Sequence, residues 1–135
     1  MNTIRDEIMP LQSERDIISV RQAVRAWMVS EDFNILEQTK MVTAVSELAR
    51  NAIVYGGGGE ARLELLTNAA RRGIRVTIMD HGVGIKDITI AMVDGYSSRS
   101  GLGLGLSGAK RLVDEFNIWS EQGQGTRIEI TRWKK

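Results

Sequence analysis

Two stretches in the first half of the chain carry apolar side chains at three- and four-residue spacing, the pattern of amphipathic helices. The first covers residues 14–30, and Ser13, with Asp16 three residues later, supplies its expected N-terminal cap. The second covers about residues 34–54 and stops at the four glycines of 56–59. The apolar stripes consist of Ile17, Val20, Val24, Trp27 and Met28 in the first helix, and of Met41, Val45, Leu48 and Ala52 in the second.

Alternating apolar and polar residues predict strands on both sides of this helical region. An N-terminal strand over 3–9 is expected to end at Pro10. Two neighbouring strands are centred on 61–65 and 74–78, and the sequence NAARRG between them is expected to form a turn. The order of these segments favours antiparallel pairing of the two neighbouring strands.

The C-terminal third is predicted to hold one helix followed by two strands. The helix is expected over 105–116, and the strands at 117–120 (NIWS) and 126–133 (TRIEITRW), with a turn at EQGQG between them. The apolar positions that define this third helix are Ala109, Leu112, Val113 and Phe116.

Two early helices, neighbouring antiparallel strands and one late helix predict an α+β fold. We expect a two-layer sandwich in which helices cover one face of a mixed, mostly antiparallel sheet. A chain of 135 residues fits a single domain, 1–135, with one hydrophobic core.

Composition narrows the classes of function. The 18 basic and 17 acidic residues nearly cancel, which argues against nucleic acid as a partner. The chain has no cysteine and one histidine, His81, so thiol chemistry is excluded and most zinc sites and Ser-His-Asp triads are disfavoured. No apolar run approaches the roughly 20 residues of a membrane span, and the N-terminus is too charged for a signal peptide. We therefore expect a cytoplasmic protein that does not enter a membrane.

The first candidate for chemistry is the sequence ELARN, 47–51. At helical spacing, Glu47 and Asn51 lie one turn apart at the border of the buried stripe. A solvated glutamate and an asparagine near a helix end would look the same in sequence. The alternative is a carboxylate base beside an oxygen ligand suited to Mg²⁺.

The second candidate is Asp80, which continues the alternation of Ile74, Val76 and Ile78 toward the core face. A carboxylate there needs a partner, and the N–H of an exocyclic amino group on a base is one candidate. Gly82 and Gly84 follow and allow close backbone approach. A strand-terminal aspartate that starts a turn is the competing interpretation.

The third candidate is the glycine-leucine segment GLGLGLSG, 101–108, at the start of the expected third helix, where free backbone N–H groups favour an anion. Gly103, Gly105 and Gly108 match the spacing of a dinucleotide fingerprint, but a polar loop precedes them instead of the buried strand that fingerprint needs. The P-loop pattern fails, because Lys110 follows an alanine and precedes no Ser or Thr. A flexible loop whose leucines fill a groove is the remaining alternative.

These motifs together resemble the GHKL, or Bergerat-fold, ATP-binding family: E-x-x-x-N on a helix, D-x-G-x-G after a strand, a glycine-leucine loop before a helix, and GQGT before a strand. The resemblance covers about residues 10–133. Within the family, ELARNAIVYGGGG and the segment from GLGLGLSG to GQGT are most similar to the anti-sigma-factor kinase branch and to the RsbT-type switch kinases of the bacterial stressosome. The resemblance implies a Bergerat-type sandwich and a serine/threonine protein kinase that uses ATP and Mg²⁺. Its expected substrates are STAS-domain proteins, and binding to a downstream phosphatase is a further implication.

Carried over to matching positions, the family pattern makes Glu47 the general base toward the acceptor hydroxyl and Asn51 the Mg²⁺ ligand. Asp80 would accept a hydrogen bond from the adenine amino group, and Thr126 would support the adenine from the last strand. The other implied nucleotide-binding positions are Gly82 and Gly84 at the adenine, Gly101, Gly103 and Gly105 at the phosphates, Tyr55 at the nucleotide border, and Ser98 and Arg99 in a lid over 85–100. For Tyr55 the alternative is an aromatic ring that closes the core, and for Ser98 and Arg99 it is a solvated loop.

Other functions remain as alternatives. A histidine kinase would need a dimerisation helix pair with a phosphoacceptor histidine, for which the chain has no room. An anti-sigma factor that sequesters a sigma factor and phosphorylates its STAS-domain antagonist is the closest competitor. An ATP-gated binding module without phosphoryl transfer is a third possibility, against which the glutamate at position 47 argues.

Overall fold

The structure, a computed structural model, describes residues 1–84 and 102–135. Five strands and three helices occur in this part of the chain. Their order is β1 (Asn2–Leu11), α1 (Glu14–Ser30), α2 (Ile35–Val54), β2 (Gly59–Asn68), β3 (Arg71–Asp80), α4 (Leu102–Arg111), β4 (Glu115–Glu121) and β5 (Gly125–Trp133).

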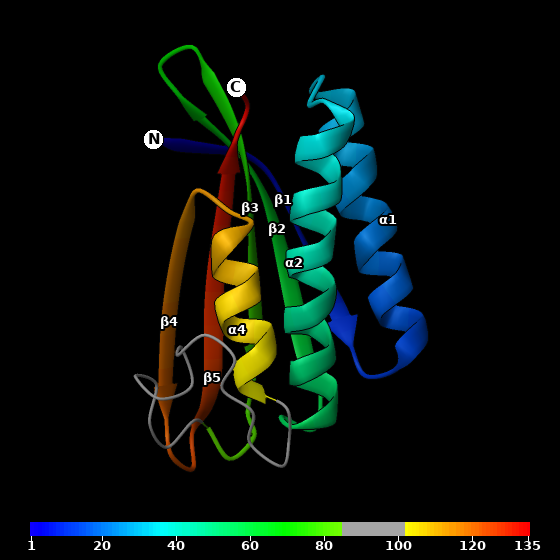
Figure 1. Cartoon of the computed structure of the whole chain (residues 1–135), viewed down its shortest axis with the longest axis vertical. Coiled ribbons are helices and arrows are strands. Elements are labelled where there is room, and N and C mark those ends of the chain that lie inside the picture. The colour runs from blue at the N-terminus through cyan, green and yellow to red at the C-terminus, as the bar shows by residue number, and fades with distance from the viewer. Residues whose placement is uncertain (85–101) are drawn as a thin grey trace.

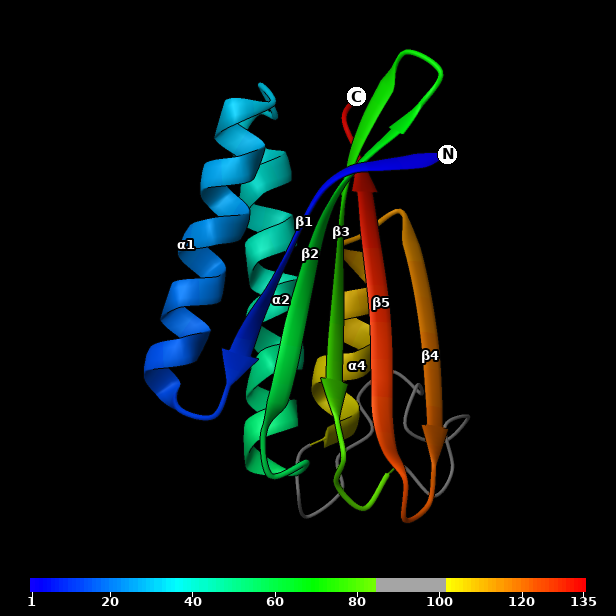
Figure 2. The same ribbon diagram turned by 180° about the vertical axis from the view of Figure 1, so that it is seen from behind.

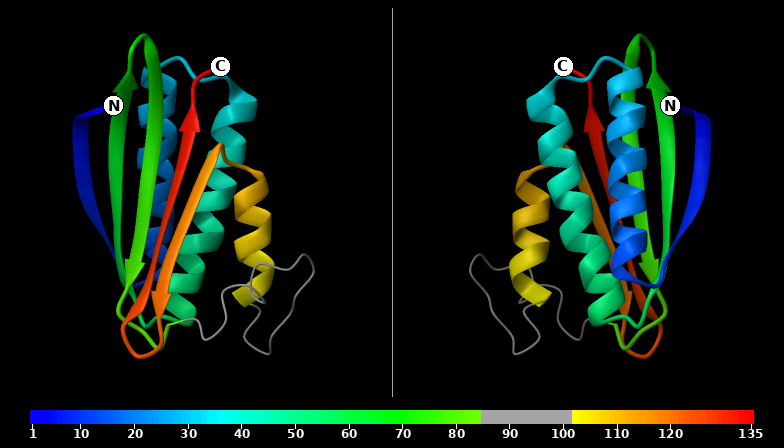
Figure 3. Two further views of the ribbon diagram at one scale, coloured as in Figure 1. Left: turned by 90° about the vertical axis from the view of Figure 1, so that its left-hand side faces the viewer. Right: turned by 90° about the vertical axis from the view of Figure 1, so that its right-hand side faces the viewer.

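The strands form one sheet in the order β1-β2-β3-β5-β4, and every pairing in it is antiparallel. All three helices lie on the same face of this sheet (Figure 1), and the view from behind shows the opposite face uncovered (Figure 2). The side views separate the helical layer from the sheet layer (Figure 3). The predicted α+β two-layer sandwich is confirmed, and its sheet is antiparallel throughout the described strands.

Both N-terminal helices begin at caps that the sequence encodes. The Asp16 carboxylate accepts the backbone N–H groups of Gln12 (2.8 Å) and Ser13 (3.3 Å). In α2, the Asn34 side chain accepts the Glu37 N–H (2.8 Å) while the Glu37 carboxylate accepts the Asn34 N–H (2.9 Å). These bonds satisfy N–H groups that have no partner within the helix.

The apolar stripes of α1 and α2 pack on the sheet, and every side chain that defined the two predicted stripes is buried. On the strands, alternate residues face the helices, as the period of two requires. The buried core positions of the strands include Ala61, Leu63, Leu65, Ile74, Val76, Ile78, Ile128 and Ile130.

The N-terminal strand is longer than predicted. β1 continues through Pro10 to Leu11, and Pro10 lies opposite Glu60 in the ladder with β2. β1 is an edge strand, where a row of N–H groups has no neighbouring strand, so a residue without an N–H is tolerated. Pro10 therefore does not end the strand.

The hairpin between β2 and β3 is tighter than the predicted turn NAARRG. Asn68 pairs with Arg71, which leaves Ala69 and Ala70 as a two-residue connection. Ala69 adopts a left-handed conformation with φ 56°. Such two-residue turns match the twist of the flanking strands and let pairing continue almost to the tip.

The predicted helix over 105–116 is wrong in its extent. Helix α4 ends at Arg111, and Phe116 lies in β4, opposite Ile130 of β5. Between helix and strand, the Asp114 carboxylate accepts the backbone N–H of Trp133 (2.7 Å), which fixes the start of β4 beside the end of β5. The spacing of the apolar residues up to Phe116 is compatible with a helix, but pairing with β5 makes the segment that contains Phe116 a strand.

The uncovered face of the sheet carries a network of ion pairs. Arg75 of β3 donates through Nε and Nη2 to both oxygens of Glu64 in β2, at 3.0 and 3.1 Å. The Thr3 hydroxyl of β1 donates to the same carboxylate (2.9 Å), and Arg62 pairs with Asp6 (2.9 Å). Although Glu64 is only 5% exposed, both of its oxygens have partners, which is the condition for burying a charge.

Four element ends meet at one end of the sandwich. The C-terminal ends of α2 and β3 and the N-terminal ends of α4 and β5 all lie at the lower end in Figure 1. This arrangement brings together residues that are far apart in sequence and positions the site described next.

Candidate functional site

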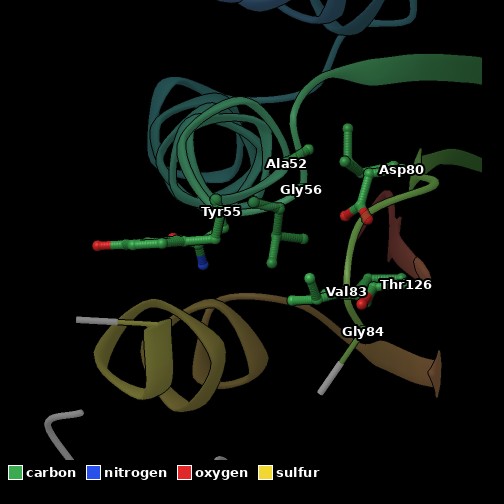
Figure 4. Close-up of a pocket in the computed structure, with 11 residues that line it drawn as sticks. Ala52, Tyr55, Gly56, Asp80, Val83, Gly84 and Thr126 are labelled. Atoms are coloured by element: carbon green, nitrogen blue, oxygen red, sulfur yellow. The ribbon is translucent and has the colours of Figure 1, made fainter. Parts of the chain in front are cut away.

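A cavity of about 240 Å³ opens at this end of the sandwich, between α2 and the adjoining ends of β3 and β5. Figure 4 shows α2 on one side of it, with Asp80 and Thr126 on the other. Of the predicted site residues, Asn51, Tyr55, Asp80, Gly84 and Thr126 line this cavity. The apolar part of its wall consists of Leu48, Ala52, Ile78, Val83 and Ile128.

Asp80 supplies the charged group of the cavity. It is the last residue of β3, and its carboxylate points into the space, as the strand alternation predicted (Figure 4). Burial raises the pKa of Asp80, while hydrogen bonds from the backbone N–H groups of Gly82 (2.9 Å) and Thr126 act in the opposite direction. His81, the next residue, is exposed and does not line this cavity. The ionised carboxylate can accept hydrogen bonds from a ligand N–H group.

Two glycine backbones pack beside this carboxylate. A β-carbon at Gly56 would come within 2.6 Å of Asp80 Oδ2 and 2.7 Å of the Ala52 carbonyl oxygen. A β-carbon at Gly82 would come within 2.6 Å of the Gly56 α-carbon, so Gly82 packs against protein backbone and is not among the lining residues. Gly84 does line the cavity, with φ 77°, a conformation that other residues rarely adopt.

Sequence reasoning missed Gly56, because the run of four glycines was interpreted only as the end of a helix. The available signal was its position, one residue after Tyr55 at the end of the helix that carries Asn51. It also missed Val83, whose side chain lines the cavity although it is 72% exposed. Neither residue has a polar side chain that would mark it as functional.

Thr126 lies opposite Asp80 in the β3–β5 ladder and is buried, on the same face as Ile128. Its hydroxyl oxygen is 2.9 Å from Ser120 Oγ of β4. Ser120 Oγ in turn donates to the carbonyl oxygen of Gly125 at 3.0 Å. The Thr126 hydroxyl therefore has a fixed hydrogen-bond partner behind the cavity wall.

Asn51 and Tyr55, at the C-terminal end of α2, form part of the cavity wall. The Asn51 side-chain nitrogen Nδ2 is buried and has no hydrogen-bond partner in the described part of the chain. Tyr55 is the C-cap residue of α2 and is partly exposed at the rim. Glu47, one turn before Asn51, is exposed and does not belong to the lining. The helix thus presents an unsatisfied amide to the cavity and a carboxylate outside it.

The residues present fit a magnesium ion shared with a bound phosphate better than a site built from protein ligands alone. An asparagine side-chain oxygen is a hard ligand of the kind that Mg²⁺ prefers, and Asn51 lines the cavity. Among the residues that the structure describes, no group of three or more His, Cys, Asp or Glu could hold a metal. Further ligands would have to come from phosphate and water.

The structure describes only some of the residues that were predicted to bind the phosphates or to form the lid. Helix α4 begins at Leu102, so Gly103 and Gly105 lie in its first turns. Gly101, Ser98, Arg99 and the predicted lid over 85–100 lie outside the described residues. The start of α4 lies at the same end of the molecule as the cavity (Figure 1), where helix N–H groups without internal partners favour an anion.

These features suit a planar ligand that carries phosphate. The cavity combines apolar walls with the Asp80 carboxylate as a hydrogen-bond acceptor, and α4 begins at the same end of the fold. The aromatic base of a nucleotide, with its amino group, could occupy the cavity while the phosphates of the nucleotide extend toward the N-terminus of α4.

The comparison with protein families agrees with this geometry. The model of the family described as histidine kinase-, DNA gyrase B- and HSP90-like ATPase matches residues 37–135. The matched range contains α2 from Glu37 onward, the residues that line the cavity and every strand except β1. No helix in the described part of the chain has the length and apolar character needed to cross a membrane.

Curated relatives cover most of the chain. The sequence is 40% identical over 123 residues to the serine/threonine-protein kinase RsbT of Bacillus subtilis, which covers 91% of this chain and 92% of that protein. It is 33% identical over 113 residues to the anti-sigma F factor of Clostridium novyi, which covers 80% of this chain and 79% of that protein.

Solved structures share the fold. A crystal structure of the RsbU and RsbW domains of a Mycobacterium tuberculosis protein matches 97% of this chain and 33% of that chain, with a TM-score of 0.66 and 19% identity. A chain in the SiaB–SiaC complex of Pseudomonas aeruginosa matches 97% of this chain and 90% of that chain, with a TM-score of 0.56 and 16% identity. At these identities the similarity establishes the architecture alone.

Proposed function

Because the chain belongs to the family of histidine kinase-, DNA gyrase B- and HSP90-like ATPases, we propose that its cavity binds ATP and Mg²⁺ for phosphorylation of STAS-domain regulatory proteins. The chain is a homologue of a serine/threonine-protein kinase over 91% of its length, which supports a kinase of the partner-switching kind. We further propose that residues 1–135 act as a single cytoplasmic kinase domain.

The observation that carries this proposal is the position of Asp80. Its carboxylate points into a cavity with largely apolar walls and accepts a hydrogen bond from the Gly82 N–H (2.9 Å). An adenine in the cavity would donate a hydrogen bond from its amino group to this carboxylate and would contact Val83 and Ile78. Thr126 would border the same edge of the base, and Gly84 would let backbone approach its face.

The phosphates of the nucleotide would extend from the adenine toward Asn51 and the start of α4. Asn51 would hold Mg²⁺ through its side-chain oxygen, and the glycines at 101, 103 and 105 would let backbone N–H groups approach phosphate oxygens. When bound, Mg²⁺ would neutralise charge on the phosphate oxygens. Tyr55 would border the nucleotide at the rim, and Ser98 and Arg99 would contact it from the lid.

We assign to Glu47 the role of the base that meets the protein substrate. It is exposed, one helical turn from Asn51, and outside the nucleotide cavity. A serine or threonine hydroxyl of a docked partner could reach it from solvent and give up its proton as the phosphoryl group is transferred. Positioning and charge neutralisation supply most of the catalysis of phosphoryl transfer, so few other groups are needed.

The higher identity to RsbT than to the anti-sigma F factor favours a switch kinase of stressosome signalling. In this role the protein would phosphorylate STAS-domain proteins and also bind a downstream phosphatase. The alternative is an anti-sigma factor with kinase activity, supported by 33% identity over 113 residues.

Incubation with γ-labelled ATP, Mg²⁺ and the purified STAS-domain proteins of the same genome tests the proposal. We expect label on serine or threonine of at least one of them. Absence of label from all of them would contradict the proposed substrate class. Stable capture of a sigma factor would instead favour the alternative.

A further inference from the structure

One large aromatic side chain is exposed on the uncovered face of the sheet. The chain has three tryptophans, of which Trp27 and Trp133 are each 4% exposed, whereas Trp119 of β4 is 48% exposed. Trp119 follows Ile118, which packs against the core, so its ring lies on the face that no helix covers (Figure 2). Tryptophan is among the side chains that contribute most binding energy when a protein interface forms.

Two hollows adjoin the ring of Trp119 on this face. One has a volume of about 320 Å³ and is lined in part by Met79, His81, Gln124 and Arg127. The other has a volume of about 310 Å³ and is lined by Asn117, Ile118, Arg127 and Glu129. Trp119 and Arg127 line both hollows, so these two side chains lie between them.

The charges beside Trp119 differ from those of the ion-pair network on the same face. In that network, Arg62 and Arg75 each pair with a carboxylate of a neighbouring strand. Arg127, which lies opposite Trp119 in the β4–β5 ladder, has no ion pair in the described part of the chain. Glu121, two residues after Trp119 and on the same face of β4, likewise has none among the described residues. The surface therefore exposes one cation and one anion without counter-charges.

A second copy of the chain supplies both missing counter-charges. A partner that carries only acidic groups would neutralise Arg127 but repel Glu121, and a basic partner would do the reverse. In a two-fold symmetric pair, the same surface occurs on both copies, so Arg127 of each copy can meet Glu121 of the other. Trp119 adjoins both residues and would lie close to the symmetry axis, where the two rings pack against each other.

We propose that the surface formed by Trp119, Glu121 and Arg127 binds the same surface of a second copy of this chain. All three helices lie on the other face of the sheet (Figure 1), so this pairing leaves Glu47 of both copies exposed to a protein substrate. It requires no nucleotide, and its failure would leave the proposed function unaffected.

Sedimentation equilibrium of the purified chain at several concentrations tests the pairing with three variants. Trp119→Ala removes the ring, whereas Arg127→Glu and Glu121→Arg each place like charges against each other across the axis. Ile8→Ala is the matched control, because Ile8 is 61% exposed on the same face of the sheet but belongs to β1, at the opposite edge.

We expect the parent and Ile8→Ala to dimerise with a Kd of about 10–100 µM, as suits a small interface. Each of the three variants should raise this Kd by about tenfold or more. An equimolar mixture of Arg127→Glu and Glu121→Arg should dimerise again, because both contacts of the mixed pair then join opposite charges.

Quenching of tryptophan fluorescence by acrylamide locates the contact independently. Since Trp27 and Trp133 are buried, quenching reports mainly on Trp119. It should decrease with increasing concentration of the parent and stay constant over the same range for Glu121→Arg.

A parent that remains monomeric up to about 1 mM would overturn the proposal. So would dimers that persist unchanged in Trp119→Ala and Arg127→Glu, or a mixture of the two charge variants that associates no better than either alone. Arg127 and Glu121 are exposed, so their variants should melt close to the parent. If one of them does not fold, the comparison of Trp119→Ala with Ile8→Ala still decides the outcome.

Discussion

The backbone of Gly56 lies directly against the carboxylate of Asp80, so closely that a β-carbon at position 56 would come within 2.6 Å of Asp80 Oδ2. Gly56 follows α2, and Asp80 ends β3. This contact joins the helix that carries Asn51 to the strand that carries the acidic acceptor, and it fixes where the carboxylate points.

Gly56→Ala should weaken Mg-ATP binding by about tenfold or more, because the added methyl group would displace the Asp80 carboxylate or the end of α2. Calorimetry measures the affinity directly. Gly108→Ala is the control, since a β-carbon there would meet no atom within 4 Å and α4 would gain a better helix former. We expect Gly108→Ala to bind normally, and equal affinities for both variants would show that the contact is not needed.

Asp80→Asn should separate stability from ligand binding. Burial raises the pKa of Asp80, so the stability linked to this group is greatest at low pH and falls as the pH rises through its raised pKa. At neutral pH the ligand-free variant should therefore melt no lower than the parent, and the difference should vanish in acid.

Mg-ATP should raise the melting temperature of the parent but not of Asp80→Asn, because only a ligand bound by the folded state stabilises it. Melting curves with and without nucleotide measure both effects. A variant that is less stable at neutral pH and still stabilised by Mg-ATP would contradict the role assigned to Asp80.

Glu64→Gln should destabilise the protein by about 1–3 kcal/mol at neutral pH, since it removes charge-assisted bonds from Arg75 and Thr3. Burial opposes ionisation of Glu64, but those bonds hold its pKa below the usual value. The stabilisation is therefore present above about pH 4.5 and is lost as the pH falls through the lowered pKa.

Chemical denaturation at several pH values measures this contribution. Glu129→Gln is the control, because Glu129 is more exposed and lies 4.0 Å from Arg75. A difference between parent and Glu64→Gln that persists at pH 2 would argue against an electrostatic origin.

Asn51→Ala should remove the effect of Mg²⁺ on ATP affinity without destabilising the fold. The Asn51 Nδ2 has no partner in the described part of the chain, so the substitution breaks no observed side-chain hydrogen bond. With a chelator present, parent and variant should bind ATP equally. Addition of Mg²⁺ should tighten binding only in the parent, and an equal gain in the variant would exclude Asn51 as a ligand.

The elements best predicted from sequence are those whose local signals agree with their tertiary environment. Helices α1 and α2 each have a continuous apolar stripe, with a cap signal before the first and a glycine stop after the second, and both helices were confirmed. The segment around Phe116 lacks such agreement, because its spacing suits a helix while its alternation suits a strand. Pairing of Phe116 with Ile130 resolves this conflict, and that pairing involves residues distant in sequence.

The site was predictable where a side chain had a chemical reason to be unusual. Asp80 on the apolar face of a strand and Thr126 on the apolar face of another both line the cavity. Gly56 could not be predicted in this way, because it contributes the absence of a side chain at a contact between α2 and the end of β3.

Transfer of phosphate by Glu47→Gln is the most direct test of the central claim, that this fold positions a base next to an ATP site for serine/threonine phosphorylation. The measurement is single-turnover transfer of γ-phosphate from Mg-ATP to a STAS-domain protein, with nucleotide affinity measured in parallel. We predict unchanged Mg-ATP affinity, because Glu47 lies outside the cavity, and transfer slowed by about 10²- to 10⁴-fold. Transfer at the parent's rate would contradict the account.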